Sequence, residues 1–260
     1  MIHELRLLFV AMQFLTRVPS PRWVGFEPDW LNHSARWFPL VGAFVGGVAA
    51  LVLWAASAVF PPVVAVGLSI AASVLLTGGF HEDGLADTAD ALGGAVGRER
   101  ALEIMKDSRI GSYGALALIL VLGLKAAALS AMLPALAIPA LLLAHTASRA
   151  AAVVLIRVLP YAGDIEHAKA KPLARRVSRA GVSVALGTVA GVGGLLVVCA
   201  PSHAAAVATG LVLAALGTAW SMRWLRRRLG GYTGDALGAT QQATELLVLL
   251  GWLAASRWAS

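Results

Sequence analysis

The sequence predicts an all-α integral membrane protein, a polytopic bundle of about seven transmembrane helices with an N-terminal amphipathic helix. Of its 260 residues, 58% are hydrophobic and only 13% are charged, whereas soluble domains carry about 25% charged residues. Apolar stretches of about 17 to 25 residues, long enough to cross roughly 30 Å of hydrocarbon as a helix, recur along the chain. Because lipid satisfies no backbone hydrogen bonds, these stretches are expected to be helices.

The first element is the N-terminal segment. Residues 1–18 contain an apolar run with polar ends and no small-residue cleavage site. They are expected to remain in the mature chain as an amphipathic or interfacial helix. The sequence leaves open whether this helix lies on the membrane or spans it.

The candidate spans follow a broken polar segment that ends near Arg36. No internal repeat separates them, so residues 1–260 are expected to form one membrane-embedded catalytic domain. Their many glycines are interpreted as helix packing contacts, because small residues let backbones approach closely. The expected spans lie at about 38–60, 62–80, 112–132, 135–156, 180–200, 203–222 and 243–258.

The charges between the spans predict the orientation of the bundle. The connections near 61, 134 and 201 contain no Lys or Arg, whereas the alternate connections are rich in both. Cytoplasmic connections carry the excess of Lys and Arg, so the basic connections at 81–111, 157–180 and 223–242 are expected to be cytoplasmic. The same bias accounts for the net charge of +7 without nucleic acid, for which the sequence shows no fold signature.

The stretch from Gly78 to Asp90 ends an apolar run and begins a run of carboxylates. On a helix Asp83, Asp87 and Asp90 fall within roughly 60° of one another at about 100° per residue. Like charges on one face cost free energy, which a divalent cation offsets by neutralising them. The macrodipole favours one or two acids near a helix start, but not three on one face. We therefore expect Asp83, Asp87 and Asp90 to be metal ligands.

Acids and cations gather in the same connection. Two cations, Lys106 and Arg109, adjoin the acidic stretch, as a site that handles phosphates beside a metal requires. The alternative is that they balance nearby acids and anchor the span end. Of the 14 Asp and Glu residues in the chain, half lie between residues 81 and 111: Glu82, Asp83, Asp87, Asp90, Glu99, Glu103 and Asp107.

Three further residues are candidates outside this connection. Arg149 lies inside a predicted span, so it is expected to face the bundle interior and to contact an anionic group. Lys125 is also within a span, nearer the other side, and is interpreted as equally consistent with a structural role. Asp235 stands among glycines, which permit tight turns, and is either a further ligand, a base or a turn residue.

Two motifs, FHEDGLADTAD at 80–90 and EIMKDSRIG at 103–111, resemble the signature of the adenosylcobinamide-GDP ribazoletransferase family, the cobalamin (5'-phosphate) synthases. FPLVG at 38–42 and TGDALGA at 233–239 are similar to further blocks of that family. The sequence departs from the pattern at Ala91, where glycine is common.

The resemblance implies transfer of the cobinamide phosphoryl group from adenosylcobinamide-GDP to alpha-ribazole or alpha-ribazole 5'-phosphate, with release of GMP. It also implies dependence on Mg2+ and a multi-pass location in a bacterial inner membrane, with the active site on the cytoplasmic side. Taken together with the motifs, it gives Asp83, Asp87, Asp90, Asp107 and Arg109 as the expected catalytic residues. Lys106, Arg149 and Asp235 are the expected substrate-binding residues.

Two other classes of protein stay open. A CDP-alcohol phosphotransferase has an acidic motif with an Ala-Arg pair after Asp-Gly, whereas Leu85-Ala86-Asp87 follows Asp83-Gly84 here. A cation transporter is expected to hold its acids near mid-membrane on broken helices, whereas these acids lie at a span end. The sequence does not fix the number of metal ions, the preferred ribazole form or the formation of a homo-oligomer.

Overall fold

The computed structural model describes residues 2–25, 27, 29–163 and 174–258. Within these ranges the chain forms α-helices joined by short connections, with three 3-10 turns at Arg22–Val24, Ala35–Trp37 and Pro201–His203. The helices are α1 Ile2–Leu15, α2 Trp30–Ser34, α3 Phe38–Ser57, α4 Pro62–Thr77, α5 Phe80–Leu92, α6 Arg98–Ile104, α7 Ser112–Ser130, α8 Pro134–Val158, α9 Arg179–Cys199, α10 Ala204–Leu229 and α11 Gly234–Trp258.

The prediction of a polytopic helical membrane protein is confirmed. Each of the seven predicted spans coincides with a helix, namely α3, α4 and α7 to α11. In the described part of the chain, five helical segments are long and apolar enough to cross a membrane, and a sixth is counted only if α4 and the sharply bent α5 are taken as one span. The count of seven therefore stays a prediction. The predicted last span began at 243, whereas α11 begins at Gly234 and carries polar residues into the bundle.

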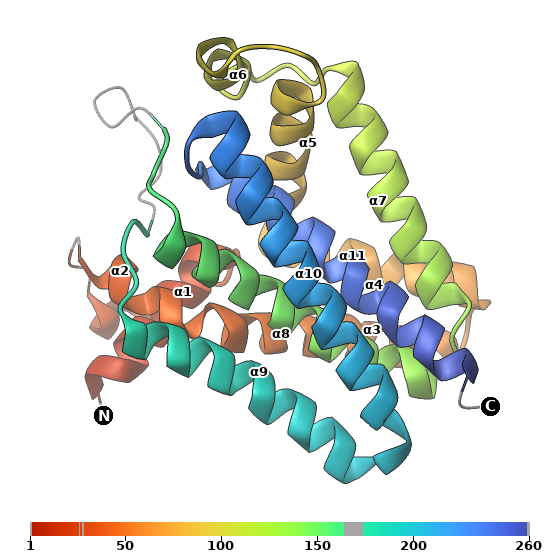
Figure 1. The fold of residues 1–260 in the computed structure, drawn as a ribbon. Helices are drawn as coiled ribbons and strands as arrows, with labels where there is room; N and C mark the ends of the chain where they lie inside the picture. The colour runs from red at the N-terminus through yellow and green to blue at the C-terminus, as the bar shows by residue number, and fades with distance from the viewer. Residues whose placement is uncertain (1, 26, 28, 164–173, 259–260) are drawn as a thin grey trace.

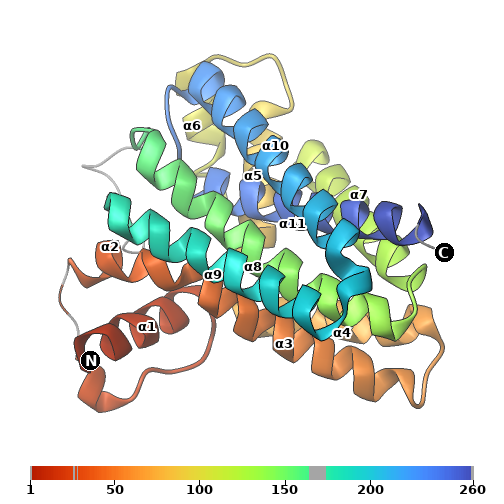
Figure 2. The same cartoon turned by 60° about the horizontal axis from the view of Figure 1, so that its bottom comes forward.

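The ends of the helices divide into two groups (Figure 1). α1, α2, α6, the start of α9 and the end of α10 lie toward the left and top of the view, and Figure 2 shows the same division. The connections after α3, α7 and α9 lie toward the right and bottom, with the C-terminus. The described parts of the basic connections thus share one end of the bundle, as their charges predict.

The helix α8 forms the centre of the bundle. In its most apolar window 78% of the residues are buried, against 22% in α7 and α9. Its partner α3 approaches closely, because a Cβ added at Gly42 would overlap the carbonyl of His145, and one at Gly46 would meet the carbonyl of Leu141 at 2.9 Å. The expected packing role of glycine is confirmed here. It is wrong for Gly191 and Gly194, which have no neighbour within 4 Å of an added Cβ among the described atoms.

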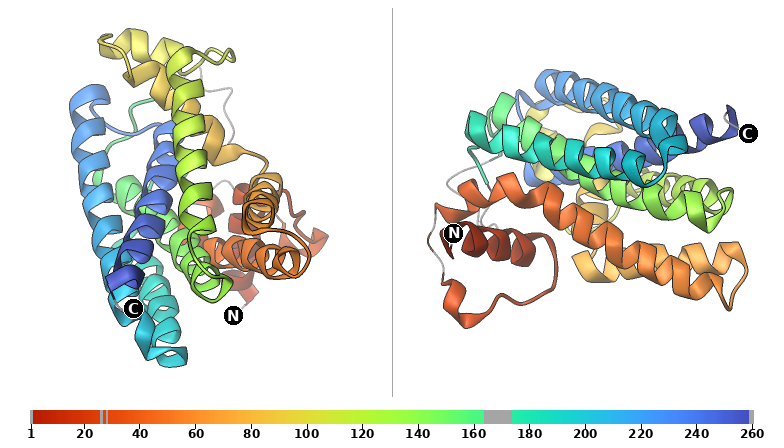
Figure 3. Two further views of the ribbon diagram at one scale, coloured as in Figure 1. Left: turned by 90° about the vertical axis from the view of Figure 1, so that its right-hand side faces the viewer. Right: turned by 90° about the horizontal axis from the view of Figure 1, so that it is seen from below.

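A right-angle corner separates α4 from the acidic helix α5. Gly78 and Gly79 both have positive φ, 74° and 71°, a conformation that glycine adopts at little cost. The axes of α4 and α5 differ by 89° across this corner. The backbone amide of Arg17, just beyond α1, donates to the carbonyl of Leu76 at 2.8 Å. α5 is thereby directed across the starts of α11 and α7 (Figure 3).

Candidate active site

The acidic stretch is a helix, as the spacing of its aspartates predicts. α5 covers Phe80–Leu92 and follows directly on the corner at Gly78 and Gly79. Asp83 is exposed, and Asp87 and Asp90 are half-buried. We place α5 in the connection between the spans α4 and α7, outside the long apolar helices.

Asp235 belongs to the same site. It lies in the first turn of α11, where an added Cβ at Gly84 of α5 would come within 2.8 Å of its carbonyl oxygen. Burial, followed by the charges of Asp235, Asp83 and Asp90, raises the pKa of Asp87 to about 7. The structure thus brings Asp235 to the three aspartates of α5, and together they concentrate negative charge on Asp87.

Asp90 has a defined structural task. Its carboxylate accepts hydrogen bonds from the backbone amides of Gly111 at 2.7 Å and Gly114 at 2.8 Å. Both amides belong to the start of α7, where orphan N–H groups favour a negative charge. Asp90 therefore anchors α7 to α5, and its role as a metal ligand stays a prediction.

The donor set at this site fits a magnesium ion that substrate helps to bind. Among the residues that the structure describes, no three His, Cys, Asp or Glu side chains form a ready-made metal cluster. Mg2+ commonly takes only one or two carboxylates and completes its octahedron with substrate phosphates and water. Asp83, Asp87 and Asp235 supply such carboxylates.

Asp107 and Arg109 pair with each other in the loop after α6. The Arg109 guanidinium reaches the Asp107 carboxylate at 2.6 Å through Nη2 and at 3.0 Å through Nε. These hydrogen bonds lower the pKa of Asp107 to about 2. Arg109 is 87% exposed. In the structure it balances the charge of Asp107, which is the alternative given above for this residue. Lys106 lies in the same loop, and the substrate role of these residues stays a prediction.

The predicted inward orientation of Arg149 is confirmed. Arg149 is 2% exposed on α8 and donates through Nη1 to the carbonyl of His145 at 3.1 Å. It lines a small interior cavity with His81, Gly234 and Gln241. Its Nε is buried and has no hydrogen-bond partner among the described atoms. Buried donors are normally satisfied, so this N–H lacks an acceptor that it would be expected to have.

A buried polar network was missed at the sequence level. Glu245 and His81, to which the sequence analysis assigns no role, are both only 5% exposed. The Lys125 ammonium lies 2.6 Å from a Glu245 carboxylate oxygen, whose other oxygen lies 3.1 Å from His145 Nδ1.

The network continues from the ion pair to α5. Lys125 also donates to Gln242 Oε1 at 2.6 Å, and Gln242 Nε2 donates to Glu82 at 2.9 Å. Glu82 is thus directed into the bundle, toward α11. In the sequence, two features indicate such a network: the polar residues at 241, 242 and 245 beside an apolar run, and a lysine inside a span.

A larger recess lies beside Asp83. It has a volume of about 790 Å3 and is bordered by α1, α2 and the α4–α5 corner. Phe14, Leu31 and Phe80 give it apolar walls, and Arg17 and Asp83 are its charged residues. Its volume is in the usual range of small-molecule sites, roughly 300 to 1,000 Å3.

Comparison with known proteins points to one family. A sequence model described as cobalamin-5-phosphate synthase matches residues 7–253. An adenosylcobinamide-GDP ribazoletransferase of Leptothrix cholodnii is 61% identical, covering 98% of this chain and 97% of its own length. Relatives of the same name from Shewanella amazonensis and Polaromonas naphthalenivorans are 48% and 44% identical, each alignment covering at least 94% of both chains. No solved structure matches.

Proposed function

The chain belongs to the cobalamin-5-phosphate synthase family, and on this premise we propose that the aspartates around Asp87 form its catalytic centre. Its function is that of a transferase in cobalamin biosynthesis, which joins adenosylcobinamide-GDP and ribazole. The observation that carries the assignment to this site is the close approach of Asp235 to α5 at Gly84, which adds its charge to those of Asp83, Asp87 and Asp90. These acids lie at the basic end of the bundle, within the family motif at 80–90 and the family block at 233–239.

The chemistry requires charge neutralisation more than a protein nucleophile. A ribose hydroxyl of the acceptor attacks the cobinamide-side phosphorus, the bond to the bridging oxygen breaks, and GMP leaves with that oxygen while the hydroxyl proton passes to solvent. A bound Mg2+ supplies positive charge to the diphosphate and to the leaving group. Two of the carboxylates of Asp83, Asp87 and Asp235 would hold the ion.

Other residues position the reactants. Arg149 Nε, the buried donor that lacks a partner, would donate to a phosphate oxygen, because guanidinium groups bind phosphate strongly. Asp90 keeps the start of α7 against α5 through its two backbone hydrogen bonds. The recess beside Asp83 gives a large ligand access to the acidic site.

A reconstituted assay tests this function. Purified protein in lipid nanodiscs, given adenosylcobinamide-GDP and alpha-ribazole, is expected to release one GMP for each cobalamin formed. Chelation of divalent ions is expected to stop the reaction, and added Mg2+ to restore it. Formation of product at an unchanged rate after complete chelation would contradict the magnesium site but not the transferase activity.

Arg149 gives a prediction for a single side chain. Arg149→Leu removes the donor but keeps a side chain that suits the bundle interior, so turnover is expected to fall at least about 100-fold, as for loss of a donor to transition-state charge. Turnover and thermal unfolding are measured together. Near-normal turnover in the folded variant would exclude a substrate role. Arg149→Lys, which keeps the charge, is expected to recover part of the activity.

We also propose a location in the inner membrane with the acidic site facing the cytoplasm. Accessibility of single cysteines tests it. The native Cys199 is exposed and must first be replaced, because it lies close to 203 in the sequence. Lys169→Cys is expected to react from the cytoplasm and His203→Cys from the opposite side. Position 169 lies outside the described residues. Reaction of position 203 from the cytoplasm alone would overturn this orientation.

A further inference from the structure

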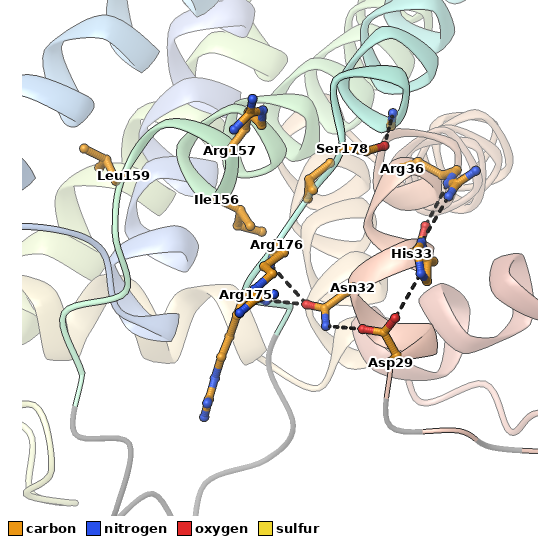
Figure 4. A pocket seen from close by; sticks show the side chains of 12 residues that line it. Asp29, Asn32, His33, Arg36, Ile156, Arg157, Leu159, Arg175, Arg176 and Ser178 are labelled. Atoms are coloured by element: carbon orange, nitrogen blue, oxygen red, sulfur yellow. Dashed lines mark hydrogen bonds and ion pairs between the residues drawn. The ribbon is translucent and has the colours of Figure 1, made fainter.

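A second recess, separate from the one beside Asp83, lies between α2, the end of α8 and the start of α9 (Figure 4). Its volume is about 610 Å3. We call it the arginine pocket, because Arg36, Arg157, Arg175 and Arg176 all line it. Ile156, Leu159 and Val177 supply an apolar floor beneath these cations.

The charged groups of the arginine pocket are unequally engaged. Asp29, its acidic residue, accepts from Asn32 Nδ2 at 2.9 Å and lies 3.0 Å from His33 Nε2, so each carboxylate oxygen has a partner. The Arg36 guanidinium contacts Glu4 at 3.3 Å, and Arg175 lies over the ring of Tyr161. None of these contacts is a hydrogen bond of the Arg157 or Arg176 guanidinium, the two other arginines of the pocket.

The guanidinium groups of Arg157 and Arg176 are available to a ligand. Neither donates a side-chain hydrogen bond to any other described residue. Both side chains are exposed to solvent, and Asp29 is the acidic residue whose charge acts on Arg176. An excess of positive charge therefore faces this recess.

The backbone around the arginine pocket is held in place. The Asn32 side-chain oxygen accepts from the backbone amides of Arg175 at 2.7 Å and Arg176 at 3.1 Å. Ser178 caps α9 by accepting from the amide of Gly181 at 2.9 Å. The start of this 21-residue helix adds a positive pole that favours an anion.

We propose that the arginine pocket binds a phosphate monoester through Arg157 and Arg176, and that the 5'-phosphate of the acceptor is this group. The identity of the ligand rests on the proposed function. In a 5'-phosphorylated ribazole the 5' oxygen is already esterified, so another ribose hydroxyl attacks and the monoester persists in the product. Guanidinium groups bind such a group in bidentate fashion.

The position of α2 supports this assignment. Leu31 borders the recess beside Asp83, whereas the next two residues, Asn32 and His33, border the arginine pocket. The two recesses therefore flank one short helix at the same end of the bundle. The phosphate of a lipid headgroup offers the same chemistry, because this end also meets the membrane surface.

Binding measurements distinguish the 5'-phosphate of the acceptor from the phosphate of a lipid headgroup. The full-length protein in phosphatidylcholine nanodiscs is titrated by calorimetry with alpha-ribazole 5'-phosphate and with alpha-ribazole, without Mg2+ or donor. The wild type is expected to bind the phosphorylated form at least tenfold more tightly. Arg157→Gln combined with Arg176→Gln should abolish this preference and leave the affinity for alpha-ribazole unchanged. Arg227→Gln, an exposed arginine at the end of α10, is the matched control.

The second part of the experiment tests the lipid headgroup, with nanodiscs that contain phosphatidic acid. If the double variant loses binding of phosphatidic acid and keeps its binding of the acceptor, the arginine pocket binds the phosphate of a lipid and not that of the acceptor. If neither ligand distinguishes the folded double variant from wild type, the proposal is overturned. Calorimetric binding does not require turnover. If the wild type is inactive but still binds phosphate in a way that depends on Arg157 and Arg176, the proposed function is refuted and the phosphate site is not.

Discussion

Replacing Asp83 or Asp87 with asparagine is expected to reduce turnover by at least about 100-fold while the protein stays folded. Asparagine keeps the shape of the side chain and removes its charge, so it would weaken the binding of Mg2+ and of the diphosphate. Loss of one group that stabilises transition-state charge typically costs about 100- to 1,000-fold. GMP release measured against Mg2+ concentration should show both a lower maximum and a higher magnesium requirement.

Two variants of the same substitution serve as controls. Asp90→Asn removes a carboxylate that accepts two backbone amides at the start of α7, so a stability loss of about 0.5 to 2 kcal/mol is expected, as for a helix cap. Asp107→Asn breaks an exposed pair, so the stability of this variant should stay close to that of wild type. Wild-type turnover with an unchanged magnesium requirement in Asp83→Asn and Asp87→Asn would rule the metal site out.

The helical face of the acidic stretch could be predicted because it depends on local spacing alone. Asp83, Asp87 and Asp90 follow the 3.6-residue period, and α5 is a helix over these positions. The inward orientation of Arg149 was also predictable, because lipid penalises an exposed charge whatever its neighbours are.

The remaining features depend on contacts between distant segments. Nothing local to Asp90 reveals that its partners are amides 21 and 24 residues away. Likewise, hydropathy treats each residue alone and gives no sign that Lys125 on another helix neutralises Glu245. The arginine pocket joins residues near 32, 157 and 176, a juxtaposition that only the fold creates.

The buried ion pair gives the second large expected effect. Lys125→Met is expected to lower the free energy of unfolding by about 3 to 5 kcal/mol, because it leaves the Glu245 charge buried without its closest cation. Lys125 and Glu245 are 4% and 5% exposed, so water cannot replace the missing partner. Reversible unfolding of the variant in a single detergent, compared with wild type, measures the loss.

A double-mutant cycle shows whether pairing, rather than side-chain volume, causes this loss. Glu245→Gln in the Lys125→Met background removes the unpaired charge and keeps an acceptor for Gln241, so part of the stability is expected to return. Breaking the exposed pair of Arg100 and Glu103 by Arg100→Gln should cost less than about 1 kcal/mol. Equal losses from Lys125→Met and Arg100→Gln would show that the buried pair contributes little.

The position of this pair also connects stability to catalysis. Lys125 shares Gln242 with Glu82, the residue that precedes Asp83 on α5. Loss of Lys125 frees Gln242 and loosens the first turn of the acidic helix. The folded fraction of Lys125→Met should therefore need more Mg2+ for half-maximal turnover than wild type does. An unchanged magnesium requirement in a destabilised Lys125→Met protein would mean that the network supports the bundle alone and does not position α5.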